Sequence, residues 1–123
     1  RIPYNTIVRN EEWNDLFIEQ LDRLTDWNSP EPVGVFVDGM YSALKVHNYF
    51  QSKGVVIGKK LKLISFDDSI WLECAYPAIT AIRQPFAQMG EVAMKKLFNM
   101  MRGFKETTEY IKPELIVRAS TKS

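Results

Sequence analysis

The sequence predicts an α/β fold with a doubly wound, mostly parallel sheet between two layers of helices. Short apolar runs typical of strands alternate with longer stretches whose apolar residues recur at helical spacing. The run VGVFV (33–37) is apolar throughout, as expected of a strand covered on both faces. Parallel strands need crossover connections, which are usually helices, so the alternation favours three α/β/α layers.

Five segments have the length and composition of strands, and helical stretches separate them. Two prolines in NSPEP (28–32) end the first helical stretch before VGVFV begins. Gly54 and Gly103 each follow an apolar helix face, where a glycine stops a helix. The expected strands are residues 5–8, 33–37, 61–66, 79–83 and 114–118. The expected helices are residues 11–27, 40–50, a shorter stretch after Asp68, and 86–101.

Length, charge and cysteine content limit the classes of function. A chain of 123 residues is one ordinary domain. Its formal net charge of +1 gives no field that would hold it on nucleic acid or an acidic membrane. Cys74 is the only cysteine, which excludes an internal disulfide and a multi-cysteine zinc site and suits a reducing cytosol. The apolar runs are too short to span a bilayer, and residues 1–10 lack an apolar signal core.

Two aspartates lie where a ligand would be expected in such a sheet. Asp38 directly follows VGVFV and Asp67 directly follows LKLISF, so neighbouring strands would deliver both carboxylates to one crevice. Trp13 follows the first expected strand and could form a wall of that crevice. An aromatic face combined with carboxylates that accept hydrogen bonds from hydroxyls is suited to a sugar or another small polar ring.

These residues also have simpler structural interpretations. Asp38 and Asp68 could be helix N-caps, and Trp13 could be a hydrophobic staple at a helix start. Catalysis by Asp67 would need a partner acid or base, and Asp68 should point to the opposite side of an extended chain. A metal site would need a denser acidic loop or His and Cys ligands, so no metal or cofactor is expected.

Other conspicuous residues favour packing over chemistry. His47 lies on the apolar face of a helix, where a packed histidine is more common than a base. The methionines of the last helical region are simplest as core or interface residues: Met89, Met94, Met100 and Met101. Neither a GxGxxG phosphate loop nor a GxSxG nucleophile turn occurs, so the sequence does not predict an enzyme.

Several motifs, in order, resemble the C-terminal part of the effector-binding core of LacI/GalR-type bacterial transcription regulators. The family pattern has an apolar strand ending in a small residue, an aromatic and two acidic or amide residues, then a run ending in Gln-Pro, a Gly-containing helix and a final Arg-x-Ser-Thr. The corresponding residues are Ser65 to Asp68, Pro77 to Pro85, Gly90 and Leu115 to Thr121. The resemblance covers residues 30–121 well and the first thirty residues loosely.

The resemblance implies a periplasmic-binding-protein-like fold, in which two lobes enclose an effector cleft. It places Asp67 on an acidic residue that contacts effector and Trp13 near an aromatic that stacks on it. The ligand-binding residues we expect are Asp67, Trp13, Asp38 and Phe66. The family's asparagine before Asp38 is Val37, and its small residue three positions later is Tyr41, which leaves effector specificity open.

The resemblance also implies that the chain is part of a longer core. Residues 1–78 would belong mainly to the second lobe, and residues 79–123 would cross back toward the first lobe and end in the C-terminal strand. DNA would be bound only through an N-terminal domain absent from this chain. Subunits would pair through residues 40–52 and 69–78, and the candidate exposed interface residues are Tyr41, Leu44, Trp71, Leu72, Cys74 and Tyr76.

The sequence therefore predicts the effector-sensing and dimerisation core of a cytoplasmic transcription regulator, a homodimer that binds a small polar effector, expected to be a sugar. Effector binding would change DNA affinity through lobe closure. The alternative is a periplasmic-type sugar-binding protein, which shares the fold. The C-terminal PELIVRAST, by its resemblance to the regulators, weighs against that alternative.

Overall fold

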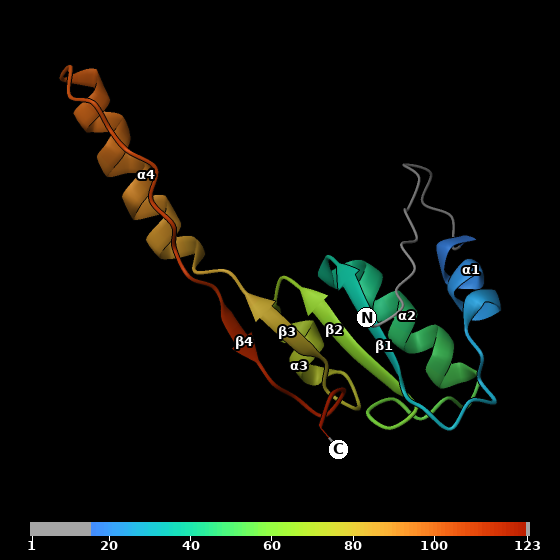
Figure 1. Cartoon of the computed structure of the whole chain (residues 1–123). Coiled ribbons are helices and arrows are strands. Elements are labelled where there is room, and N and C mark those ends of the chain that lie inside the picture. Colours follow the sequence, from blue (N-terminus) through green and yellow to red (C-terminus); the bar gives the residue numbers. More distant parts are fainter. Residues whose placement is uncertain (1–15, 123) are drawn as a thin grey trace.

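The computed structural model describes residues 16–122, which form two regions that we call the sheet body and the arm (Figure 1). The sheet body comprises residues 16–83 and 114–122, and the arm comprises residues 84–113. The elements in chain order are α1 (Leu16–Leu24), β1 (Val33–Asp38), α2 (Met40–Ser52), β2 (Leu61–Phe66), α3 (Ile70–Cys74), β3 (Thr80–Arg83), α4 (Phe86–Met101) and β4 (Glu114–Ile116). Trp13 and the expected strand at residues 5–8 lie outside the described residues.

The sheet has the strand order β1-β2-β3-β4 and is mostly parallel, as predicted. β1 pairs with β2, and β2 with β3, in parallel, with Val33 opposite Leu61 and Ile64 opposite Thr80. β4 runs antiparallel to β3, because the chain returns from the arm beside the strand that it left. This antiparallel edge makes the sheet mixed.

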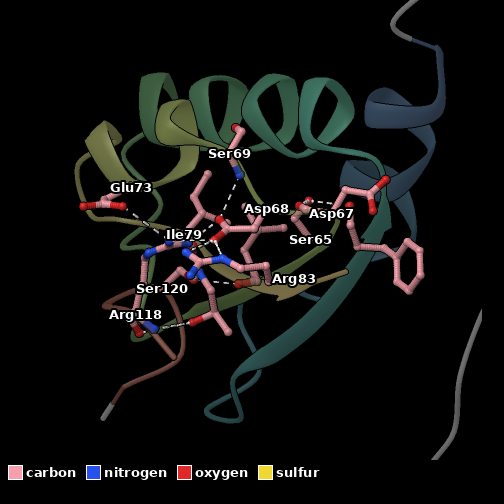
Figure 2. A network of polar contacts seen from close by, with 12 residues as sticks. Ser65, Asp67, Asp68, Ser69, Glu73, Ile79, Arg83, Arg118 and Ser120 are labelled. Atoms are coloured by element: carbon pink, nitrogen blue, oxygen red, sulfur yellow. Dashed lines mark hydrogen bonds and ion pairs between the residues drawn. The ribbon is translucent and has the colours of Figure 1, made fainter. Parts of the chain in front are cut away.

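The helices of the sheet body cover one face of the sheet. α2 and α3 lie on the same side in Figure 2, and α1 lies beside α2, where Tyr49 donates a hydrogen bond to the Asp22 carboxylate at 3.0 Å. Exposure alternates along β1, and the Phe36 side chain is 61% exposed. The expectation that both faces of residues 33–37 are covered is therefore wrong for the described part of the chain.

The core lies between the sheet and these helices. Its buried apolar residues are Ile18, Ala43, Val46, Phe50, Ile57, Leu61, Leu63, Leu72, Ile79 and Ala81. His47 is buried beside them, and its Nε2 lies 3.2 Å from the carbonyl oxygen of Pro77, which confirms the packed interpretation of this histidine. All of these residues belong to the sheet body.

The C-terminal tail is joined to the middle of the sheet by Ser120, which is fully buried. The Ser120 hydroxyl donates to the carbonyl oxygen of Leu63 at 2.6 Å and accepts from the backbone N–H of Thr80 at 2.8 Å. Its own backbone N–H donates to the carbonyl oxygen of Ala78 at 2.9 Å. The chain is thus secured to the sheet body after it returns from the arm.

The arm projects away from the sheet as one long helix with the return segment 104–113 alongside it (Figure 1). α4 contains no buried residue. Gly54 and Gly103, with φ of 77° and 84°, follow the ends of α2 and α4 as predicted. The methionines of α4 are exposed, so the core interpretation of this group is wrong for the described chain: Met89, Met94, Met100 and Met101.

Candidate ligand groove

A groove of about 410 Å³ opens at the carboxyl ends of β1 and β2. Its lining residues are Asp38, Gly39, Met40, Tyr41, Ser42, Asp67, Asp68 and Phe86. The two strands therefore bring Asp38 and Asp67 to one site, as the order of strands and helices predicted. Aromatic rings come from α2 and from the start of α4. Carboxylates next to aromatic faces can bind the hydroxyls and the apolar face of a small polar ring.

Asp67 adopts a backbone conformation that few residues other than glycine accept. Its φ is 70°, in the left-handed region where aspartate is tolerated because its short side chain can bond locally. The hydroxyl of Ser65, which is fully buried, donates to the carbonyl oxygens of Phe66 at 3.0 Å and of Asp67 at 3.1 Å. The Gln84 side-chain amide donates to Asp67 Oδ1. The carboxylate is thus already used as a hydrogen-bond acceptor.

Asp68 is held by two arginines and points away from Asp67 (Figure 2). Its side chain is 3% exposed. Arg118 donates to Asp68 through Nη1 at 2.7 Å and Nη2 at 3.0 Å, and Arg83 donates through Nη2 at 2.6 Å and Nε at 3.0 Å. This paired geometry makes charge-assisted hydrogen bonds of the stronger kind.

Neither aspartate that was considered as a helix cap occupies a cap position. The N-cap of α2 is Gly39, and the N-cap of α3 is Ser69. Asp68 accepts the backbone N–H of Ser69 at 2.9 Å, but its oxygens mainly bind the two arginines. The N-cap interpretation of Asp38 and Asp68 is therefore wrong.

The ion pairs set the charge state of Asp68. The Arg118 guanidinium, and then Arg83, hold the pKa of the Asp68 carboxyl below its usual value. Asp68 in turn raises the pKa of Arg118. Both groups are consequently charged at neutral pH.

Phe66 does not line this groove. It lines a second hollow, of about 400 Å³, between α4 and the return segment of the arm. This hollow is mainly apolar, with Met89, Val92 and Ile111 among its walls. Phe66 pairs with Asp38 in the sheet and directly precedes Asp67, but it lines this other hollow, so the groove does not support its expected role in ligand binding.

The expected interface residues differ in exposure. Tyr41, Trp71 and Tyr76 are 51%, 66% and 86% exposed, and Cys74 is also exposed. Leu44 is half-buried against the core. The expectation that Leu72 is exposed is wrong, because α3 directs it into the core, where its exposure is 0%.

Phe86, which lines the groove, and three polar residues that bind the aspartate pair were not selected from the sequence. Gln84, Arg83 and Arg118 belong to the Gln-Pro and Arg-x-Ser-Thr motifs, but nothing in their spacing shows that they converge on the aspartate pair. Arg83 and Arg118 meet at Asp68 because β3 and β4 are neighbours, with Arg83 opposite Glu114, and Gln84 binds Asp67 from the position after β3. That antiparallel pairing was the missing information.

Within residues 16–122, no group of three or more His, Cys, Asp or Glu side chains could hold a metal ion. No helix in this range has the length and apolar character needed to cross a membrane.

A family model for the periplasmic binding protein-like domain matches residues 3–121. The chain belongs to this family. Among curated relatives of this periplasmic binding protein-like chain, the HTH-type transcriptional regulator DegA of Bacillus subtilis is 30% identical over 105 residues, which are 84% of the chain and 31% of the relative. The chain spans about a third of the length of the curated relatives that it matches.

Solved structures agree with this assignment of the periplasmic binding protein-like chain. A LacI family transcriptional regulator from Bifidobacterium animalis subsp. lactis has a TM-score of 0.75 and 31% identity, with 85% of this chain and 39% of that chain covered. A sugar-binding transcriptional regulator (LacI family) from Enterococcus faecalis has a TM-score of 0.73 and 26% identity, with 86% and 39% covered. The resemblance to a LacI/GalR-type effector-binding core is confirmed.

Proposed function

We propose that this chain is the ligand-sensing part of a bacterial transcription regulator and that its groove binds a small polar effector, a sugar. The observation that carries the proposal is the placement of Asp38 and Asp67 in one groove with the rings of Tyr41 and Phe86. In this proposal, the hydroxyl groups of the effector donate hydrogen bonds to the two carboxylates, and an aromatic ring covers the apolar face of the effector. The sugar-binding regulator from Enterococcus faecalis supports this ligand class.

We further propose that the whole regulator is a cytoplasmic homodimer without enzymatic activity and that it binds DNA through a separate N-terminal domain. Effector binding changes the DNA affinity by a coupling free energy of about 1 to 3 kcal/mol. The similarity to named transcriptional regulators supports this assembly. The exposed aromatic side chains of Tyr41, Trp71 and Tyr76 are suited to the subunit interface. Sedimentation of the intact core at high micromolar concentration checks the dimer, and a strict monomer would contradict it.

The ligand site is tested by replacing Asp67 with asparagine in the intact core. Asp67→Asn keeps the side-chain size but removes the charge from its hydrogen bonds, each worth about 1.5 to 3 kcal/mol, so affinity should fall roughly tenfold to a hundredfold. Calorimetric titration with D-glucose, D-ribose and adenosine measures the affinity. Asp26→Asn, in the exposed turn after α1, is the matched control.

Two results would contradict the proposal. The first is no binding of any of these probes by the unmodified core. The second is a lower melting temperature of Asp67→Asn with unchanged affinity, which would show that this aspartate only supports the loop.

A further inference from the structure

Both ends of the arm meet at one carboxylate in the sheet body. Arg83 is the last residue of β3, immediately before the arm begins, and Arg118 follows β4, after the arm has ended. Both guanidinium groups bind Asp68, with shortest distances of 2.6 Å and 2.7 Å (Figure 2). Arg83 and Arg118 are 35 positions apart in the sequence. Asp68, which connects them, lies in the loop between β2 and α3.

The first residues of the arm complete the ligand groove. The Gln84 amide binds Asp67, and Phe86 is a lining residue of the groove. Arg83, the last residue of β3, directly precedes Gln84, so the groups that bind Asp68 and Asp67 come from consecutive residues where the chain leaves the sheet. The direction in which the arm leaves the sheet therefore determines where the Gln84 amide and the Phe86 ring lie in the groove.

Within the described chain, the arm has apolar contact with the sheet at Phe66, but no residue of α4 enters the buried core. α4 has no buried residue, and the strand pairing at the base of the arm within residues 16–122 consists of one three-residue ladder from β3 to β2 and another from β3 to β4. The Asp68 and Arg118 side chains are 3% and 10% exposed, whereas the Arg83 side chain is 50% exposed. The nearly buried pair of Asp68 and Arg118 is shielded from solvent, and Arg83 joins this pair to the start of the arm.

We propose that Asp68 is a positioning residue of the ligand groove: by binding Arg83 and Arg118 together, it holds the base of the arm, and with it Gln84 and Phe86, at the site. Asp68 does this from the wall of the groove, with its carboxylate oxygens bound to the two arginines. Its effect on ligand binding rests on the function proposed above, but its effect on the arm does not.

The orientation of the arm can be measured without a ligand. Spin labels on the native Cys74, which is exposed in α3, and on Glu91→Cys, which is exposed in α4, give the distance between the sheet body and the arm by pulsed electron double resonance. Dilution with unlabelled protein removes distances between subunits. The unmodified chain should give one narrow distance.

Asp68→Asn should replace this narrow distance by a broad distribution and lower the melting temperature by about 10 °C, because two arginines lose their partner. Arg83→Gln should broaden the distribution with little change in melting temperature, since its side chain is half-exposed. Asp68→Glu, which retains the charge, should restore part of the narrow distance.

Asp22→Asn is the matched control. Asp22 is also a bound aspartate, with Lys53 at 2.5 Å and Tyr49 at 3.0 Å, but it lies at the α1–α2 contact, remote from the arm. This variant should lose stability and keep the narrow distance. If both Asp68→Asn and Arg83→Gln also keep it, the positioning role is overturned, while ligand binding by Asp67 is unaffected. Failure of the sugar titrations, conversely, would leave the distance result standing.

Discussion

The sheet body and the arm are stabilised in different ways. The sheet body buries a continuous apolar core, and Phe50, Leu61 and Leu63 in it have an exposure of 0%. The arm has large apolar side chains too, but Leu97, Phe98 and Met101 are 50%, 55% and 74% exposed. Polar contacts hold the arm instead, at its base through Asp68 and along its length through Lys96 and Glu106. The apolar side chains of α4 therefore have no buried contact among residues 16–122.

The largest difference in stability between the two regions is expected when a leucine is replaced by alanine in each of them. Leu63→Ala removes a fully buried side chain and should reduce the free energy of unfolding by about 2 to 5 kcal/mol. Leu97→Ala removes a half-exposed one and should cost well under about 1 kcal/mol. Urea unfolding of the two variants measures both values. Equal costs would mean that the arm is packed as tightly as the core.

The second prediction concerns the acid stability of the contact between the two regions. The folded pKa of Asp68 lies below the unfolded value of 3.8, so its stabilising contribution is complete above pH 3.8 and is lost as the pH falls through the folded pKa. The difference in melting temperature between the unmodified chain and Asp68→Asn should be large at neutral pH and should shrink as the pH falls below 3.8. A constant difference would show that the ion pairs do not stabilise the fold.

Asp26→Asn is the control for this pH series, because it removes one negative charge from an exposed turn of the sheet body. Its melting temperature should follow that of the unmodified chain. A pH dependence equal to that of Asp68→Asn would assign the effect to net charge.

A smaller effect is expected where the chain rejoins the sheet body after the arm. Ser120→Ala removes the acceptor of the Thr80 N–H and the donor to the Leu63 carbonyl, both buried, and should cost about 1 to 3 kcal/mol. Ser52→Ala removes an exposed hydroxyl that donates to the Tyr49 carbonyl, and it should be nearly neutral. Thermal unfolding of both variants is the measurement. A neutral Ser120→Ala would mean that the tail does not secure the sheet.

The sequence predicted the sheet body better than the arm, for a physical reason. Apolar periodicity reports local burial, so it predicted β1, β2 and α2, and the carboxyl ends of the two strands then placed Asp38 and Asp67 in one groove. It identified α4 as an amphipathic helix as well, but it could not show that its apolar face is exposed in this chain.

The aspartate pair shows the same limit on prediction. Asp68 was considered as a helix cap because local spacing permits it, whereas its partner Arg118 is 50 positions away. Such a partner becomes visible only when the pairing of β3 and β4 is known. Residues that join distant segments are therefore the ones that local patterns miss.

The smallest effect is expected along the arm itself. Glu106 accepts hydrogen bonds from Asn99 at 2.5 Å and from Lys96 at 3.3 Å, and it joins the return segment to α4. Glu106→Gln weakens these contacts, so amide hydrogen exchange in residues 104–113 should accelerate while the melting temperature stays the same, because the core lies in the sheet body. Glu109→Gln is the matched control, since Glu109 contacts Lys96 at 3.5 Å and is half-exposed. A lower melting temperature for Glu106→Gln would show that the arm unfolds together with the sheet body, and the distinction between the two regions would then be wrong.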